Sequence, residues 1–433
     1  MNTNTIIKIK IIIFFLFFLP HLYSQSTNQN YIISKTILND QSTLSMDKIE
    51  YFDGIGRLSQ TVQKKITSSG KDLILNNEYD NIGRIANVWL PVPYSGNGSY
   101  LENASLISVS QSTYGSSEIP YSKSIYESSP LDRVVQQYGP GVDWYSNGKA
   151  ISTAHLTNQS SGVLSCAWYI VTSSGMLQKK GLYPSAKLYI TKTNDEDGKT
   201  SYQFIDFLGR VILSRQTSEL GMNDTYYVYD DLNNLRYVLP PLASDALSLN
   251  GGVWDASNQA LKDYAFVYQY DERNRNIEKK LPGVDPIYMV YDRSDRLVLI
   301  QDGNQRLKNV WTVNKYDKHG RNIYTSEVLE PTSFSKLLEW FKDWLVVEEF
   351  GTPVPYYPME DTGYTRGFYI TQPTRLLSVN YYNTYEFMQM LPESIKNELI
   401  FVQQSGFENQ HTNSKGLLTG SRIYDVNDST NYI

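Results

Sequence analysis

Cysteine and histidine are scarce in this chain of 433 residues, and basic residues are fewer than acidic ones. The single cysteine, Cys166, excludes an internal disulfide framework, so stability must come from packing. A lone cysteine is most often a small buried apolar residue. The four histidines are too scattered in the sequence to form a metal motif. The net charge of −6 argues against nucleic acid or an anionic membrane surface as a partner.

Long apolar runs are also rare, and the longest one lies at the N-terminus. Lys8 and Lys10 precede the run at residues 11–19, and Pro20 follows it. This order is typical of a secretory signal peptide, and the run is too short for the roughly 20 residues of a spanning helix. We expect cleavage after Ser24 and export from a Gram-negative bacterium, either as a secreted or as a cell-surface protein. Without this segment the charge is 37 − 45 = −8, since it holds two lysines and no acid.

Recognisable catalytic motifs are missing as well. There is no G-x-S-x-G elbow, and the glycine-rich stretch DGIGRL lacks the third glycine of a dinucleotide-binding loop. Cys166 could pair with His155 as a thiol nucleophile, but no family signature surrounds it. The sequence therefore predicts no enzyme, and it indicates no catalytic residue, no cofactor site and no metal site.

What the chain does have is one short motif repeated seven times. Each copy has an aromatic or apolar residue, an Asp, two variable residues, a residue that tolerates positive φ, and usually an Arg. The aspartates are Asp53, Asp80, Asp206, Asp230, Asp271, Asp292 and Asp317. The residues three positions later are Gly56, Gly83, Gly209, Asn233, Asn274, Asp295 and Gly320. The arginines that follow in six copies are Arg57, Arg84, Arg210, Arg275, Arg296 and Arg321.

The motif has the chemistry of a β-hairpin turn. Its Asp can accept hydrogen bonds from the backbone N–H groups ahead of it, which favours a capping role over a catalytic one. Its fourth residue suits a type I turn that is closed in the left-handed region. Aromatic residues alternate before Asp271, as expected for a strand. The repeat arginines are expected to pair with acids on neighbouring strands or to lie over Tyr rings.

Other segments interrupt or follow the repeats. Residues 94–181 are rich in Ser, Gly and Asn, but their tryptophans indicate a folded insertion. The stretch NDEDGK at residues 194–199 lacks the later ligands of a calcium loop, so a hairpin turn is favoured. WDASN at residues 254–258 could be a worn copy, and YDVND at residues 424–428 could begin another. Apolar residues at helical spacing predict an amphipathic helix near 333–350, packed on the sheet: Phe334, Leu337, Leu338, Phe341 and Leu345.

The repeated unit resembles the YD repeats of Rhs-type proteins. The phrases YFDGIGRLSQTVQ, SSPLDRVVQQYGPGVDW, QYDERNRNIEKKLPG, DRLVLIQDGNQR and SKGLLTGSRIYDV are similar to those of secreted Rhs proteins of Bacteroidota. In such proteins an uncharacterised N-terminal domain precedes YD repeats. The resemblance, which runs from about residue 45 onward, implies a β-sheet wound into a hollow shell that often encloses a C-terminal toxin. No core-repeat terminus, self-cleavage motif or toxin is recognisable here, so only the scaffold role carries over.

The expected fold is mainly β, with YD-repeat hairpins in a wound or curved antiparallel sheet that forms part of an Rhs-type shell. The expected divisions are a signal peptide (1–24), an N-terminal β domain with two repeats and a Ser/Gly-rich insertion (25–186), a YD-repeat region (187–329), and a helix-containing insertion with the start of further repeats (330–433).

The expected function is a non-catalytic secreted scaffold, linked to toxin encapsulation and delivery or to cell-surface interaction. The remainder of an Rhs protein or a toxin domain would be its partner. The alternative is a secreted carbohydrate-binding or carbohydrate-active surface protein in which aromatic side chains such as Trp144 stack on sugars. A third possibility is a truncated fragment whose exposed sheet edges aggregate. The sequence predicts no membrane span once the signal peptide is removed.

Overall fold

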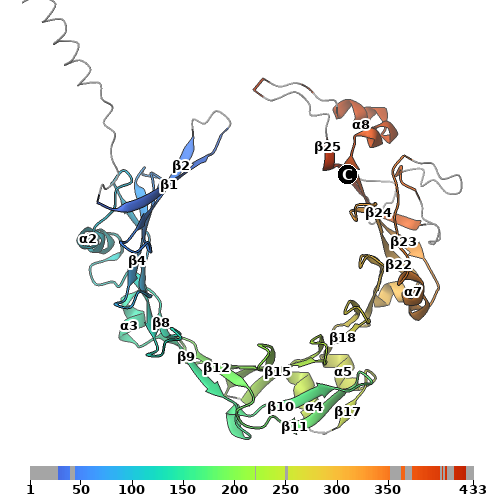
Figure 1. Cartoon of the computed structure of the whole chain (residues 1–433), viewed down its shortest axis with the longest axis horizontal. Helices are drawn as coiled ribbons and strands as arrows, with labels where there is room; N and C mark the ends of the chain where they lie inside the picture. The colour runs from blue at the N-terminus through green and yellow to red at the C-terminus, as the bar shows by residue number, and fades with distance from the viewer. Residues whose placement is uncertain are drawn as a thin grey trace, which may run out of the picture. The chain divides into compact units, whose positions relative to one another are not determined.

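The computed structural model describes residues 28–39, 44–219, 221–248, 252–351, 362–365, 373–399, 402, 405–406 and 414–425. The predicted signal peptide lies outside these residues. The described chain is mainly β, as predicted, and its strands pair in the antiparallel direction in both units. The chain divides into two compact units, one of residues 1–156, 189–203 and 216–221 and one of the remainder. Figure 1 labels many of the helices and strands that are named below.

The first unit is a series of short hairpins with two helices. Its strands are β1 (Asn30–Ile37), β2 (Ser45–Phe52), β3 (Leu58–Gln63), β4 (Asp72–Tyr79), β5 (Ile85–Trp89), β6 (Val92–Tyr94), β7 (Tyr121–Tyr126), β8 (Val134–Tyr138), β9 (Ala150–Thr157) and β12 (Tyr189–Asn194). The helices are α2 (Asn103–Tyr114) and α3 (Val142–Ser146). Strands β13 (Thr200–Ile205) and β14 (Val211–Ser218) run across the boundary between the units.

The core of the first unit combines Leu106 of α2 with residues of strands β2 to β6. Alternate strand residues point into it because successive side chains of a strand lie on opposite faces. The buried members are Ile49, Tyr51, Val62, Ile74, Trp89, Val92, Leu101 and Leu106. The buried Gln60 ties this core to the loop before α2, since its amide oxygen accepts from the Leu101 N–H at 2.8 Å and its amide nitrogen donates to the Leu101 carbonyl at 3.0 Å.

The second unit holds the later repeats. Its strands are β10 (Ala167–Val171), β11 (Leu177–Leu182), β15 (Gly221–Tyr229), β16 (Leu235–Leu239), β17 (Val253–Trp254), β18 (Phe266–Tyr270), β19 (Asn276–Lys280), β20 (Ile287–Tyr291), β21 (Leu297–Gln301), β22 (Val310–Tyr316), β23 (Asn322–Leu329), β24 (Pro373–Asn383) and β25 (Ser414–Ile423). Its helices are η1 (Gly162–Leu164), α4 (Pro241–Ser248), α5 (Gln259–Tyr264), α6 (Gly303–Leu307), α7 (Phe334–Phe341), η2 (Glu386–Met390) and α8 (Glu393–Glu398).

The predicted amphipathic helix forms, but it is shorter than expected. Helix α7 ends at Phe341 instead of continuing towards residue 350. Leu337 and Phe341 are buried in the core of β20–β23, as predicted, whereas Leu345 is 48% exposed. After α7 come a turn at Lys342 and a bend at Asp343, and the Trp344 carbonyl then accepts from the Arg293 N–H at 2.7 Å. A contact with a repeat turn thus replaces the next helical turn.

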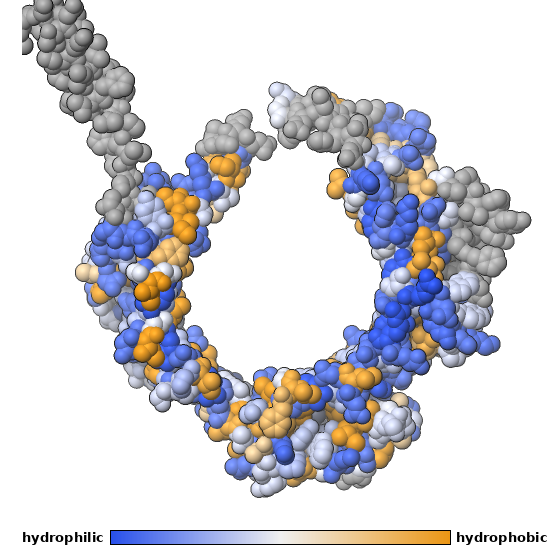
Figure 2. Space-filling model, in the orientation of Figure 1, coloured by the Kyte–Doolittle hydropathy of each residue, from blue (hydrophilic) through white to orange (hydrophobic). Residues whose placement is uncertain are grey.

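Hydrophilic and hydrophobic residues are interspersed on the surface seen in Figure 2. Within the described residues, no helix is long and apolar enough to cross a membrane.

Candidate functional site

The seven predicted repeat turns all form. In each, the fourth residue adopts the left-handed conformation that its type permits, with φ between 59° and 96°: Gly56, Gly83, Gly209, Asn233, Asn274, Asp295 and Gly320. The turn at Asp317 shows the common bonding. The Asp317 N–H donates to the Arg321 carbonyl, and the Gly320 N–H donates to the Asp317 carbonyl, both at 3.0 Å.

Each repeat Asp organises its turn with both carboxylate oxygens. Oδ1 of Asp317 accepts from the backbone N–H of His319 at 2.8 Å and of Arg321 at 3.0 Å. Oδ2 accepts from Nε of Arg321 at 2.6 Å. The same three bonds recur at Asp53, Asp80 and the other arginine-bearing copies. The predicted capping role is confirmed, and the arginine pairs with the Asp of its own turn.

The hydrogen bonds of the turn lower the pKa of several repeat aspartates. At Asp53 and Asp80 the N–H of the following arginine is the largest cause. Burial alone would raise the pKa of Asp271 and Asp317, but hydrogen bonds from Arg275 and Arg321 outweigh it, and both pKa values are lowered. These carboxylates therefore stay charged at neutral pH, as acceptors that hold the turns closed.

The arginines also connect each hairpin with the next one. In the β3–β4 pair Gln60 faces Asn76, and moving three residues along each strand brings Arg57 opposite Tyr79. The guanidinium lies 4.2 Å from the centre of the Tyr79 ring. The same stacking, at 4.2–5.1 Å, occurs at six junctions: Arg57–Tyr79, Arg84–Tyr126, Arg210–Tyr229, Arg275–Tyr291, Arg296–Tyr316 and Arg321–Tyr382. The expectation that the repeat arginines lie over Tyr rings is thus confirmed.

A second bond accompanies the stacking. The Tyr79 hydroxyl donates to the carbonyl of Leu58, the residue after Arg57, at 2.9 Å. The equivalent bonds join Tyr126 to Ile85, Tyr316 to Leu297 and Tyr382 to Asn322, so four stacked junctions carry both contacts. Tyr270 bonds in the same way to the Leu235 carbonyl, where Asn234 stands in place of the arginine. The Tyr of each such repeat therefore links its own hairpin to the hairpin before it. We call this set of arginine–tyrosine contacts the relay.

The relay also explains which residue stands at the fourth turn position. Nη1 of Arg210 donates to the Asn233 side chain at 3.1 Å, and Nη1 of Arg275 donates to the Asp295 side chain at 3.0 Å. These polar residues combine positive φ with an acceptor for the preceding arginine. At Gly83 a Cβ would lie 2.7 Å from Nη1 of Arg57, so the glycine leaves space for the guanidinium instead.

Two further turns share this chemistry and were not identified from the sequence as copies of the motif. Between β7 and β8, Glu127 takes the place of Asp, the left-handed residue is Asp132, and Arg133 pairs with Glu127 at 2.7 Å. The stretch NDEDGK forms the predicted hairpin turn, in which Asp195 accepts from the Lys199 N–H. Tyr382 continues the relay across an insertion. Two extra residues after Glu127 concealed the first of these turns, and the length of the insertion concealed the contact between Arg321 and Tyr382.

The suggested worn copy at WDASN is wrong. Asp255 accepts from the Ser257 N–H at 2.8 Å, but Asn258 then caps helix α5 by accepting from the Leu261 N–H. No returning strand follows. The suggested copy at YDVND lies largely outside the described residues.

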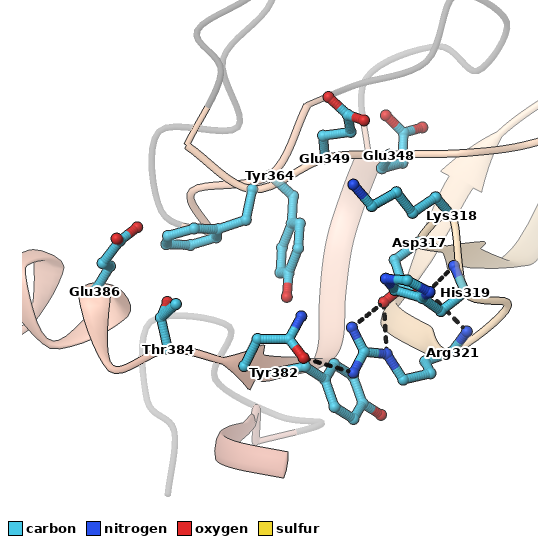
Figure 3. A pocket seen from close by; sticks show the side chains of 12 residues that line it. Asp317, Lys318, His319, Arg321, Glu348, Glu349, Tyr364, Tyr382, Thr384 and Glu386 are labelled. Atoms are coloured by element: carbon cyan, nitrogen blue, oxygen red, sulfur yellow. Dashed lines mark hydrogen bonds and ion pairs between the residues drawn. The ribbon is translucent and has the colours of Figure 1, made fainter. Parts of the chain in front are cut away.

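A cavity of about 260 Å³ adjoins the last relay junction of the second unit. It lies among Asp317, Lys318, His319, Glu349, Tyr364 and Glu386 (Figure 3). Asp317 bonds with Arg321, and Glu348 forms a buried ion pair with Lys315 at 2.7 Å and accepts from Thr365 at 2.8 Å. Among the described residues, no group of three His, Cys, Asp or Glu side chains could hold a metal ion.

Neither Cys166 nor Trp144, which the sequence singled out, lines this cavity. Cys166 is fully buried, and burial strongly raises the pKa of its thiol. The thiol lies near a buried ion pair in which Arg215 holds Asp224 with two bonds of 2.7 and 2.6 Å. Arg215 also donates to the Ser165 carbonyl, which ties the β14–β15 hairpin to the segment that carries Cys166. Trp144 is 40% exposed.

Residues 24–157 match a family model described as a domain of unknown function, DUF6443. No curated protein matches the chain.

Among solved structures, the chain is similar to TcdB2-TccC3 without its hypervariable C-terminal region (14% identity, TM-score 0.45, 86% of this chain and 15% of that one). A structure titled TcdB2-TccC3-TEV gives 13% identity and a TM-score of 0.47, with 96% and 16% covered. A Tc holotoxin pore of Photorhabdus luminescens gives 12% and 0.44, with 82% and 14% covered. The chain thus spans about 15% of the length of these chains. Similarities this low do not bear on function.

Proposed function

We propose that the chain is a non-catalytic, secreted scaffold: the front part of an Rhs-type YD-repeat shell that serves toxin encapsulation and delivery or contact with other cells. The observation that supports it best is the relay. An Arg lies over a Tyr ring of the next hairpin at six junctions, and at four of them the Tyr hydroxyl also donates to a backbone carbonyl. Repeat proteins gain stability from such nearest-neighbour junctions, which suit an extendable scaffold.

The polar side chains of the repeated motif find their partners within the fold. The repeat carboxylates accept from their own turns, and the repeat arginines contact their own Asp and the next hairpin. Because these side chains already bond within the fold, a structural role for the motif is favoured over binding or reacting with a small substrate.

The front-part assignment is tested by sequencing the DNA that follows the codon for Ile433 and expressing what it encodes together with this chain. We expect a frame with further YD repeats and a variable C-terminal domain, whose product co-purifies with this chain and resists trypsin in the complex. A following region without repeats would contradict the assignment. So would a co-expressed product that trypsin digests as fast as the isolated product.

A further inference from the structure

Strand β1 occupies the position of the returning strand of a hairpin. In the β1–β2 pair Asn30 faces Phe52, the residue before Asp53. In the β3–β4 register, Arg57 lies opposite Tyr79, the residue before Asp80. Asn30 therefore corresponds to Arg57. Residues 28 and 29 form a turn and a bend, like residues 55 and 56 of the complete copy. Residues 28 and 29 and strand β1 thus correspond to the end of the turn and the returning strand of a repeat, and they precede the first complete repeat.

The first half of that repeat is missing from the described chain. Returning strands of complete copies have a neighbour on each edge: β3 pairs with β2 and β4, and β21 pairs with β20 and β22. Strand β1 pairs with β2, and no described strand occupies its outer edge. All eight of its residues are exposed. Its outer backbone N–H and C=O groups form a template for another strand.

This edge also lacks the usual protection against pairing. Natural edge strands are blunted by charges, proline or bulges. Strand β1 carries one charge, Lys35, has no proline, and pairs with β2 without a register shift. Its large apolar residues are 40–55% exposed: Tyr31, Ile32, Ile33 and Ile37. Figure 2 shows hydrophobic surface in the region of the β1–β2 hairpin.

The residues of this chain that would supply the missing strand are poorly suited to it. In the first complete copy the strand before the turn ends at Phe52, five positions before Arg57, so the missing strand would end here at residue 25. That segment is the expected end of the signal peptide, with cleavage after Ser24, and Pro20 within it lacks a backbone N–H. We propose that the outer edge of β1 binds an antiparallel strand of a second, different polypeptide, one that ends in an aromatic–Asp pair and so completes the hairpin.

Hydrogen exchange of the chain from residue 25 onward tests this proposal. The probe is a peptide with the sequence of β4 and its turn, DLILNNEYDNIGR, which is residues 72–84 of this chain. The matched control carries proline at the positions of Leu75 and Asn77, which removes two backbone donors. We expect the probe to slow exchange of the β1 amides at least tenfold and the control to leave it unchanged. Unchanged exchange with the probe would overturn the proposal.

Two further measurements identify the occupant. If the β1 amides are already protected from exchange without the peptide, another strand covers the edge. Protection that does not depend on protein concentration indicates residues of the same chain. Protection that grows with protein concentration indicates a second copy of the chain. Either result contradicts a different polypeptide. Mass determination of the exported protein should give Gln25 as the first residue; retention of residues 1–24 would also contradict the proposal. These outcomes depend on the repeat register and not on the toxin-related role.

Discussion

At the scale of single residues, the repeat motif uses each side chain for a separate contact. The Asp closes its own turn, the fourth residue supplies positive φ, the Arg reaches forward and the Tyr reaches back. A junction of one cation–π contact and one hydroxyl bond is worth on the order of 1–2 kcal/mol. The motif is thus both a turn and a connector.

The tyrosine hydroxyl can be tested alone. Tyr316→Phe keeps the ring under Arg296 but removes the bond to the Leu297 carbonyl. We expect the free energy of unfolding to fall by about 0.5–1.5 kcal/mol, measured by urea denaturation. Tyr385→Phe is the control, because Tyr385 is 46% exposed and its hydroxyl bonds to none of the residues that the structure describes. Its unfolding curve should be unchanged. Equal effects of the two changes would refute the connector role.

The buried carboxylate of Asp292 should matter more. Its side chain is fully buried and paired with Arg296, and it also caps the turn. Asp292→Ala leaves a guanidinium without its partner, so we expect a loss of about 3–5 kcal/mol in the free energy of unfolding. Asp231→Ala, at an exposed turn position, should change it by less than about 0.5 kcal/mol. A loss below about 1 kcal/mol for Asp292→Ala would contradict this account.

At the scale of elements, the turns were predictable from the sequence because their determinants are local. Asp, the residue of positive φ and Arg lie within five positions, and all seven turns formed. The strand register that places Arg57 on Tyr79 was not predictable, since it depends on pairing between hairpins. Helix α7 was predicted too long because Leu345 continued the apolar spacing, while the contact of Trp344 with Arg293 ends the helix. The cavity beside Asp317 depends on residues brought together across an insertion, which no local pattern shows.

The insertion after β23 is fixed to the repeats by the buried Lys315–Glu348 pair, in which both side chains are at most 4% exposed. Lys315→Met should cost about 3–5 kcal/mol, because it leaves Glu348 buried without its cation. The double change Lys315→Met with Glu348→Leu should recover most of that loss. Thermal unfolding of the wild type, both single variants and the double variant measures the coupling. Additive losses would show that the two residues act independently.

At the scale of the whole molecule, many turns depend on ionised carboxylates. The pKa values of Asp53, Asp80, Asp271 and Asp317 are lowered in the folded chain, and bonds from Arg133 and Ser129 lower the pKa of Glu127 to about 2. A carboxyl group with a lowered pKa in the folded state adds stability that is complete above its unfolded pKa and disappears as the pH falls through the folded one.

Stability should therefore be constant down to about pH 4.5 and then fall steadily towards pH 2, because the unfolded chain binds protons first. Urea midpoints at successive pH values measure this. The double variant Asp53→Asn with Asp80→Asn should be less stable at pH 6 and should show a shallower decline below pH 4.5. A decline as steep as that of the wild type would show that these turns do not cause the acid sensitivity.

The central claim is that successive hairpins are coupled through the relay, and a double-mutant cycle tests it most directly. Arg57→Met and Tyr79→Leu disrupt the two sides of one junction, where the guanidinium lies 4.2 Å from the ring. We predict a coupling energy of about 0.5–1 kcal/mol between them from urea unfolding. The matched cycle of Arg57→Met with Tyr126→Leu, one junction further along, should give a coupling near zero. Zero coupling in the first cycle would contradict the account.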